Sequence, residues 1–276
     1  MKSSLKRFSF LAFSLALFLT AGPALAQLPQ PPELAARQYL LIDLNSNQVL
    51  AERDADAQAE PASLTKLMTA YLVFNALKDG KLTLDQTLPV SQRAWAQRKG
   101  GGSLMFIDTT MTPKVSELLR GLIVQSGNDA AIALAEGVSG TVENFVVAMN
   151  RQALAWGLKN TQFKNPEGLT EPGHYTSARD VAAVAARIIT EHPLHYAMYS
   201  EREYTYNRIR QDNRNLLLAR DSSVDGMKTG YTEAAGYCLV ATGERNGRRR
   251  IVVILNDTSE GVWKDAQSLL DWALKA

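Results

Sequence analysis

The chain has 276 residues, and 46% of them are hydrophobic, which is enough to bury a sizeable core. Its 30 lysines and arginines nearly balance 28 aspartates and glutamates, and its one cysteine, Cys238, excludes a disulfide within the chain. These figures argue against a strongly basic nucleic-acid-binding protein and against a disulfide-stabilised scaffold.

The first 26 residues have the three parts of a secretory signal peptide. Lys2, Lys6 and Arg7 form a basic start, residues 8–21 are almost wholly apolar, and residues 24–26 give a small-x-small cleavage signature. The apolar run is shorter than the ~20 residues that a helix needs to cross a bilayer, and an uncleaved anchor is the alternative. Without the three basic residues the chain has 27 basic and 28 acidic residues, a net charge of −1. The excess positive charge of the whole chain is therefore explained by the predicted signal peptide and does not indicate a nucleic-acid partner.

Beyond this leader, hydrophobic patterning predicts strands at both ends of the chain and helices between them. Short strands at 39–42 and 49–50 flank a turn, and a helix opened by Pro61 runs to about residue 78. Further helices are expected at 112–125, 130–136, 142–156 and 178–189, then strands at 226–231, 237–242 and 251–255 and an amphipathic helix at 262–274. This order predicts one α/β domain over residues 27–276, whose sheet is completed by both termini.

The helix that begins at Pro61 carries a serine and a lysine on one face. Its apolar residues go nearly all the way round, which is typical of a helix buried inside a domain. Ser63 and Lys66 are three residues apart, so the amine can reach the hydroxyl. Burial should lower the pKa of Lys66 and leave an amine able to take the serine's proton. The alternative is a helix-capping serine with a surface lysine, because S-x-x-K is common by chance.

Two more short motifs follow along the chain. Ser126 and Asn128 stand between two predicted helices, where a loop can project side chains into a cleft. Lys228, Thr229 and Gly230 lie on a predicted strand, whose edge an extended substrate could pair with. Each motif alone is unremarkable. The order S-x-x-K, S-x-N, K-T-G, with spacings of about 60 and about 100 residues, is highly specific.

With these motifs the sequence resembles the penicillin-recognising serine D,D-peptidases, and within them the low-molecular-mass penicillin-binding proteins that act as D-alanyl-D-alanine carboxypeptidases. The resemblance covers essentially the whole chain after the leader and includes blocks at 61–66, 102–106, 125–130, 157–161, 175–180, 224–230 and 270–272. It implies the β-lactamase-like fold, a helical cluster packed against a mostly antiparallel five-stranded sheet. It also implies a hydrolase that removes the terminal D-alanine from peptidoglycan pentapeptide stems, is acylated by β-lactam antibiotics, and needs no cofactor or metal.

The resemblance further implies a role for each catalytic residue. Ser63 would attack the carbonyl of the penultimate D-alanine, and Lys66 would take the proton of its hydroxyl. Ser126 would relay a proton to the departing nitrogen.

The remaining motif residues would bind the substrate. Asn128 would hold the substrate amide, while Lys228 and Thr229 would meet the terminal carboxylate. Gly230 and Tyr231 would complete the binding strand, with the backbone N–H of Tyr231 forming an oxyanion hole together with that of the nucleophile.

The sequence departs from the family pattern at three places. Tyr231 stands where relatives often have histidine, and Val262 stands where relatives commonly have an arginine that helps to bind the carboxylate. Lys264 is a candidate replacement for that arginine, although helical spacing could equally point its side chain to solvent. The chain also ends at Ala276, where many relatives continue into a β-rich domain and an amphipathic membrane anchor. We therefore expect a soluble exported enzyme, periplasmic or extracellular.

Two other functions are alternatives. A class A β-lactamase needs an E-x-x-x-N stretch, and here Glu167 is followed by Glu171 in place of the asparagine. A binding protein that senses β-lactams or peptides without turnover would share the same scaffold, and release of D-alanine separates it from the enzyme. The histidines at 192 and 195, next to Glu191, are interpreted as a surface loop and not as a metal site.

Overall fold

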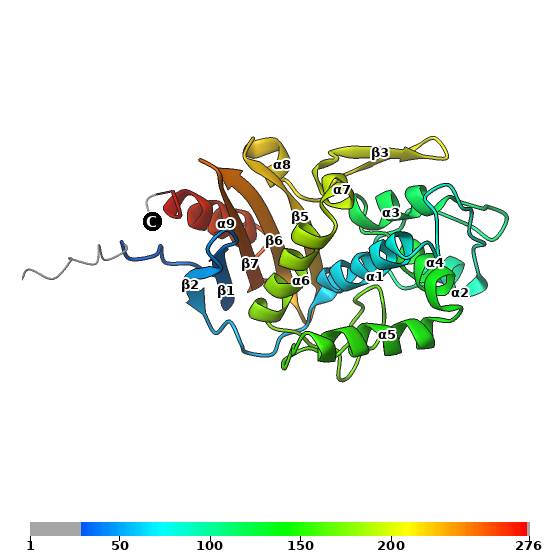
Figure 1. The fold of residues 1–276 in the computed structure, drawn as a ribbon, viewed down its shortest axis with the longest axis horizontal. Helices are drawn as coiled ribbons and strands as arrows, with labels where there is room; N and C mark the ends of the chain where they lie inside the picture. The colour runs from blue at the N-terminus through cyan, green and yellow to red at the C-terminus, as the bar shows by residue number, and fades with distance from the viewer. Residues whose placement is uncertain (1–28, 275–276) are drawn as a thin grey trace, which may run out of the picture. The chain divides into compact units, whose positions relative to one another are not determined.

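The sheet is built from both ends of the chain. The computed structural model describes residues 29–274, and the predicted signal peptide at 1–26 lies outside them. The strands are β1 (Gln38–Asp43), β2 (Gln48–Arg53), β5 (Val224–Thr232), β6 (Gly236–Arg245) and β7 (Arg248–Asp257). They lie in the order β2-β1-β7-β6-β5, and every neighbouring pair is antiparallel (Figure 1). The predicted five-stranded sheet is confirmed, and β5 is one of its edge strands.

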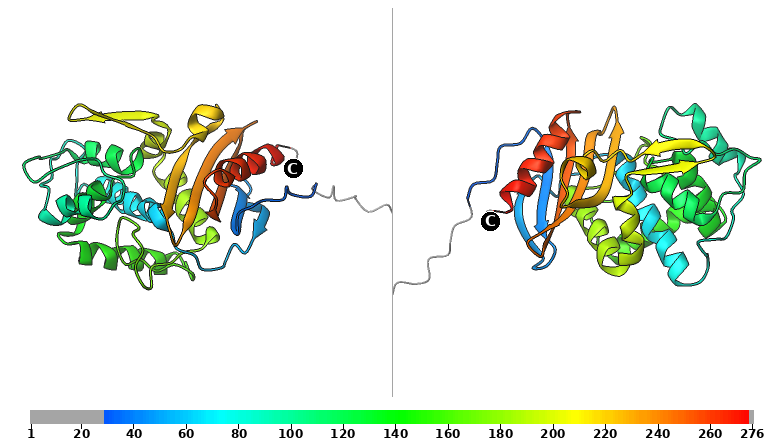
Figure 2. Two further views of the ribbon diagram at one scale, coloured as in Figure 1. Left: turned by 180° about the vertical axis from the view of Figure 1, so that it is seen from behind. Right: turned by 90° about the horizontal axis from the view of Figure 1, so that it is seen from above.

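The two faces of the sheet pack against different partners. Along β6, Leu239 and Ala241 join the cluster beneath α9 (Gly261–Trp272), whereas Val240 joins the larger core. This alternation follows from the two-residue period of a strand. Figure 2 shows α9 on one face and the other long helices on the opposite face.

The helical layer surrounds the helix that the sequence places in its centre. Its members are α1 (Lys66–Lys78), α2 (Gln92–Ala96), α3 (Val115–Ile123), α4 (Asn128–Ser139), α5 (Val142–Ala155) and α6 (Ala178–Glu191). The helix predicted from Pro61 is a 3₁₀ turn, η1 (Ala62–Thr65), followed by α1. Ala62 has a φ of +46°, which regular α-helix does not allow, and this explains the difference.

Helix ends follow local capping. The Ser177 hydroxyl accepts the N–H of Asp180 at the start of α6. Helix α3 begins later than residue 112, because the Glu117 carboxylate accepts the N–H of Lys114 and fixes the start there.

The segment between α6 and β5 was largely missed by the patterning. It contains α7 (Pro193–Tyr196), η3 (Ala197–Ser200), β3 (Glu203–Tyr206), β4 (Ile209–Asp212) and α8 (Leu217–Arg220). A short turn, η2 (Gln97–Lys99), lies earlier in the chain, directly after α2. The predicted surface loop around His192 is wrong. The His192 ring is buried, and its Nε2 lies 2.9 Å from Asn75 Oδ1, so it is held inside the core beside α1.

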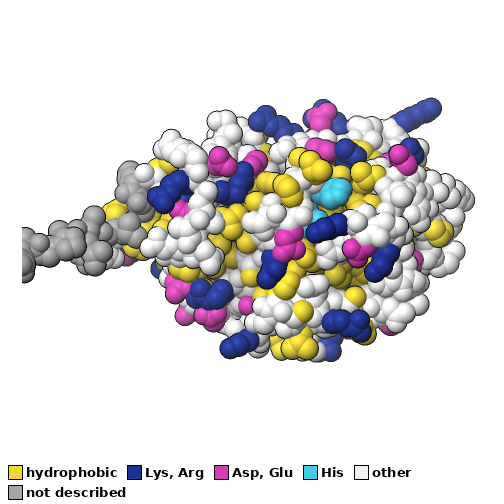
Figure 3. Space-filling view, in the orientation of Figure 1, with side chains coloured by type: hydrophobic (Ala, Val, Ile, Leu, Met, Phe, Trp, Pro, Cys, Tyr) yellow, Lys and Arg dark blue, Asp and Glu magenta, His cyan; other side chains and the backbone are white. Residues whose placement is uncertain are grey.

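The face drawn in Figure 3 carries Lys and Arg side chains interspersed with Asp and Glu, as expected for a nearly neutral chain. Among the residues that the structure describes, no single helix is long and apolar enough to cross a bilayer. Helices α4 and α5, bent by 83°, meet the length and composition criteria only as a pair.

Candidate active site

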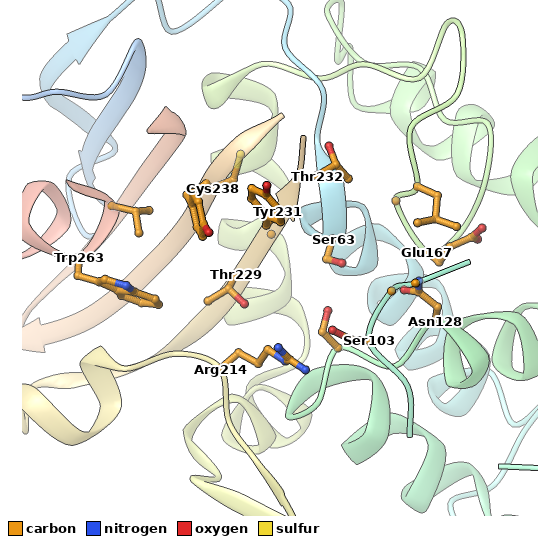
Figure 4. Close-up of a pocket in the computed structure, with 18 residues that line it drawn as sticks. Ser63, Ser103, Asn128, Glu167, Arg214, Thr229, Tyr231, Thr232, Cys238 and Trp263 are labelled. Carbon is orange, nitrogen blue, oxygen red and sulfur yellow. The ribbon is translucent and has the colours of Figure 1, made fainter. Parts of the chain in front are cut away.

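A cleft of about 470 Å³ runs along the edge strand β5, between the sheet and the helical layer. Figure 4 shows its lining side chains, which come from segments far apart in the sequence. They are Ser63, Gly101, Gly102, Ser103, Ser126, Asn128, Glu167, Gly168, Leu169, Arg214, Thr229, Gly230, Tyr231, Thr232, Tyr237, Cys238, Val262 and Trp263. The three sequence motifs therefore meet in one place.

Ser63 and Lys66 are in direct contact. Lys66 Nζ donates to Ser63 Oγ at 2.8 Å, because the 3₁₀ turn places the serine directly before the first turn of α1. The same Nζ donates to Asn128 Oδ1 at 2.7 Å and to the carbonyl of Glu167 at 2.7 Å. The lysine is thereby held in one position, with its nitrogen against the serine oxygen.

The environment of Lys66 favours the neutral amine. Its side chain is only 1% exposed, and burial lowers its pKa to about 7, against the opposing effects of the Glu167 and Asp129 carboxylates. Arg214 adds a further lowering effect. A lysine with this pKa exchanges a proton readily near neutral pH, which an unperturbed lysine does not.

A second lysine and serine face the first pair across the cleft. Lys228 Nζ donates to Ser126 Oγ at 2.9 Å and to the carbonyl of Thr229 at 2.9 Å. Burial, together with the positive charges of Lys66 and Arg214, lowers the pKa of Lys228 well below its usual value. Ser126 has a φ of +64°, a conformation that a serine adopts only when its surroundings hold it there.

Asn128 is positioned by a loop that packs over the start of α4. Its N–H donates to the carbonyl of Ser103 at 2.8 Å. The neighbouring Asp129 carboxylate accepts the N–H groups of Met105, Phe106 and Ile107 at 2.8, 2.9 and 3.1 Å. One buried carboxylate therefore fixes the loop that forms the wall of the cleft.

The K-T-G residues place the edge strand against the nucleophile. A Cβ on Gly230 would lie 3.0 Å from the backbone nitrogen of Ser63 and 3.3 Å from that of Leu64, so glycine permits the close approach. Thr229 faces the cleft. The Tyr231 side chain is 53% exposed and packs on Tyr237 with ring centroids 4.4 Å apart, so it forms part of the rim.

The candidate replacement for the family's arginine is not in the cleft. Lys264 is exposed on α9 and is not among the lining residues, whereas Val262 is buried and Trp263 lines the wall. Arg214, on the loop between β4 and α8, does line the cleft. Its Nε donates to the carbonyl of Gln125 at 3.3 Å, and it forms no ion pair within the described part of the chain. Sequence reasoning missed Arg214, because only the unpredicted β3–β4 hairpin brings it here.

Glu167 also lines the cleft, although the sequence pattern argued against a β-lactamase role for it. It is 7% exposed, burial raises its pKa, and one of its carboxylate oxygens has no hydrogen-bond partner in the described residues. Its backbone carbonyl, and not its carboxylate, accepts the hydrogen bond from Lys66. In Figure 4 its carboxylate points away from Ser63.

The arrangement supports acyl transfer to a serine. It supplies a nucleophile, a lysine whose pKa suits a base, and a second hydroxyl that accepts a hydrogen bond from a second lysine. Cys238 is no competing nucleophile, because burial raises the pKa of its thiol to about 12. Within the described residues no group of three or more His, Cys, Asp or Glu side chains is placed to hold a metal ion.

Comparisons with known proteins agree with this geometry. A family model described as D-alanyl-D-alanine carboxypeptidase matches residues 25–259. The D-alanyl-D-alanine carboxypeptidase DacA of Haemophilus influenzae is 44% identical over 245 residues, which are 88% of this chain and 62% of that protein. DacA of Escherichia coli K12 is 43% identical and covers 90% of this chain and 63% of its own length. The chain thus spans a little under two thirds of these relatives.

A solved structure matches most of this chain. Penicillin binding protein 5 from Haemophilus influenzae has a TM-score of 0.87 and 43% identity, and the match covers 89% of this chain and 72% of that one.

Proposed function

The chain belongs to the D-alanyl-D-alanine carboxypeptidase family, with its β-lactamase-like fold, and we propose that it is a serine-type carboxypeptidase that removes the terminal D-alanine from peptidoglycan stem peptides. The observation that carries the proposal is the contact between Lys66 Nζ and Ser63 Oγ at 2.8 Å, in a cleft that Arg214 also lines. The known relatives with this name support the substrate class.

The first step forms an ester on Ser63. The neutral amine of Lys66 takes the hydroxyl proton while Ser63 Oγ bonds to the carbonyl carbon of the penultimate D-alanine. The carbonyl oxygen becomes an oxyanion, and the backbone N–H groups of Ser63 and Tyr231 stabilise it; one such donor is typically worth ~10²–10³ in rate. The C–N bond then breaks, and the proton passes through Ser126 to the nitrogen of the leaving D-alanine.

The second step hydrolyses that ester with one water. Lys66, neutral again, takes a proton from the water as its oxygen bonds to the acyl carbon. The bond to Ser63 Oγ breaks, and the proton returns to the serine. The products are the shortened peptide and free D-alanine, so no co-reactant other than water is consumed.

A free carboxylate on the substrate selects the terminal position. Lys228 and Thr229 supply a buried lysine N–H donor and a hydroxyl beside Ser126, and Asn128 meets the substrate amide. We assign Arg214, and not Lys264, as the exposed cation that pairs with the carboxylate. Its guanidinium has no competing carboxylate partner among the described residues.

β-Lactam antibiotics should acylate the same serine, because they present an amide carbonyl next to a carboxylate. The name of the solved relative, a penicillin binding protein, supports this part of the proposal. Cleavage of the leader after about residue 26 would deliver the catalytic domain outside the cytoplasm, to the cell wall that contains the substrate.

Release of D-alanine from a peptide ending in D-Ala-D-Ala tests the proposal directly, with Ser63→Ala as the control. Release well above that control is expected. Equal release from both proteins would favour a binding protein without turnover, and rapid hydrolysis of penicillin without a lasting ester would favour a β-lactamase.

A further inference from the structure

A loop between α5 and α6 carries the backbone carbonyl that accepts a hydrogen bond from Lys66. This loop, residues 163–174, is here called the carbonyl loop. Two backbone hydrogen bonds, of 2.9 and 3.0 Å, join Gln162 to Tyr175 and close the loop at its base. Its tip packs tightly on the turn that contains the nucleophile, because a Cβ on Gly168 would clash with a carbonyl oxygen of η1. The position of the loop is therefore coupled to the position of the lysine.

The direction of the Lys66 lone pair depends on that carbonyl. A neutral amine has two N–H groups and one lone pair. Asn128 Oδ1 and the carbonyl oxygen of Glu167, each 2.7 Å from the lysine nitrogen, can only accept hydrogen bonds. They take the two N–H groups, so the lone pair is left for the third partner, Ser63 Oγ at 2.8 Å. Figure 4 shows Glu167 and Asn128 on the same side of Ser63. If the carbonyl moved away, an N–H group could turn to Ser63, and the amine would no longer face its proton.

A buried histidine ties the end of the carbonyl loop to η1. His174 Nδ1 accepts the N–H of Lys164 at 3.3 Å, so the neutral ring carries its proton on Nε2. That nitrogen lies 2.9 Å from Thr65 Oγ1 and donates to it. The ring is 4% exposed, and burial, together with the charge of Lys164, lowers the pKa of His174 to about 4. The ring therefore stays neutral near pH 7 and keeps this bond to the residue directly before Lys66.

The tip of the carbonyl loop is shaped by its own hydrogen bonds. Asn165 Oδ1 accepts the N–H of Gly168 at 2.7 Å, and Asn165 Nδ2 donates to the carbonyl of Leu169 at 3.0 Å. On α1, Thr69 Oγ1 donates to the carbonyl of Pro166 at 2.7 Å. The carbonyl that meets the lysine is thus held from both sides, by the threonine on α1 before it and by the histidine after it.

We propose that His174 is a positioning residue for the lysine base, which acts through Thr65 to keep the Glu167 carbonyl against one N–H of Lys66. The inference rests on the proposed function, because it concerns the same acylation step. His174 is not among the residues that line the cleft, so it touches neither the substrate nor the reacting atoms. Its loss should therefore slow the formation of the ester and leave substrate binding unchanged.

The experiment separates acylation from binding and from folding. A fluorescent penicillin is mixed with each protein at increasing concentrations, at a pH above the pKa of Lys66. The saturating rate gives the acylation step, the half-saturating concentration gives binding, and the final amount of ester gives the active fraction. His174→Ala removes the ring, whereas His174→Gln keeps one donor and one acceptor. His192→Ala is the matched control, because His192 is also buried and its Nε2 lies 2.9 Å from Asn75 Oδ1, towards the other end of α1.

His174→Ala should lower the saturating acylation rate about tenfold or more, at an unchanged half-saturating concentration. His174→Gln should bring the rate back to within about threefold of the wild type, because an amide can make both bonds. His192→Ala should keep the rate within about twofold of the wild type, even if its Tm falls. A purely structural histidine would reduce the amount of ester and leave the rate unchanged. That result overturns the inference, as does an equal loss of rate in His192→Ala.

Thr65→Val tests the same hydrogen bond from its other end, and it decides the question if His174→Ala does not fold. The variant removes the hydroxyl and keeps a β-branched side chain. Its saturating rate should fall about tenfold, and an unchanged rate overturns the inference. Failure of the proposed function looks different, because the wild type itself would then form no ester on Ser63 and release no D-alanine.

Discussion

Substitution of Gly102 by alanine should disable the cleft without unfolding the protein. A Cβ on Gly102 would lie 2.2 Å from Asn128 Nδ2 and 3.3 Å from its Cγ. The Asn128 amide must then move by roughly 1 Å to reach a normal contact distance. That movement takes Asn128 Oδ1 away from Lys66 Nζ, to which it now accepts a hydrogen bond at 2.7 Å. The expected defect is therefore in catalysis.

The size of the defect follows from the bond that is lost. A hydrogen bond between neutral groups contributes about 0.5–1.5 kcal/mol, which corresponds to a rate that is about 2–13-fold lower. The assay is the second-order rate constant for acylation by a fluorescent penicillin, with thermal unfolding measured in parallel. Gly100→Ala is the matched control, because its Cβ would meet only Gln97 O at 3.5 Å and Leu169 Cδ1 at 3.8 Å. Equal acylation of the two variants would refute this explanation of how Asn128 positions Lys66.

Three further predictions concern the charges around the cleft. Because Lys66, with its pKa lowered to about 7 by burial, must be neutral to accept a proton, the acylation rate should rise with pH through about 7 and then level off. Glu167→Gln removes a charge that raises that pKa, so the midpoint should move to lower pH; a midpoint that stays or rises would contradict the assignment. Asp129→Ala strips the acceptor from several buried N–H groups and should lower stability by about 3–5 kcal/mol, seen as a Tm drop of about 10 °C in calorimetry. Arg214→Ala should lower kcat/KM for D-Ala-D-Ala peptides about tenfold or more, and Lys264→Ala should leave it unchanged. The reverse pattern would mean that Lys264 on α9, and not Arg214, binds the substrate carboxylate.

Local sequence signals were sufficient to place the residues that lie on regular helices and strands. The apolar periodicity around Lys66 placed it on a buried helix, and the strand-like run at Lys228 placed it on β5, because burial and period are encoded residue by residue. Family resemblance then suggested that the two would meet.

The sequence did not predict the positions of residues that depend on the path of an irregular segment. Arg214 reaches the cleft only because the β3–β4 hairpin and the loop after it bring it back beside Gln125, and no periodicity in the sequence marks that path. The sequence left open whether Lys264 replaces the family's arginine, for a different reason. Helix α9 buries Val262 and Asp265 against the sheet, and its rotation turns the lysine between them to solvent. A shift of one or two residues along a helix is enough to decide whether a side chain faces the protein interior or the solvent.

The central claim is that Ser63 is the acylated nucleophile. Mass spectrometry of the protein after treatment with penicillin, followed by peptide mapping, tests it most directly. We expect one added penicilloyl group, located on the peptide that contains Ser63, and none on the Ser63→Ala variant. Acylation of any other residue, or no adduct on a folded protein, would contradict the claim.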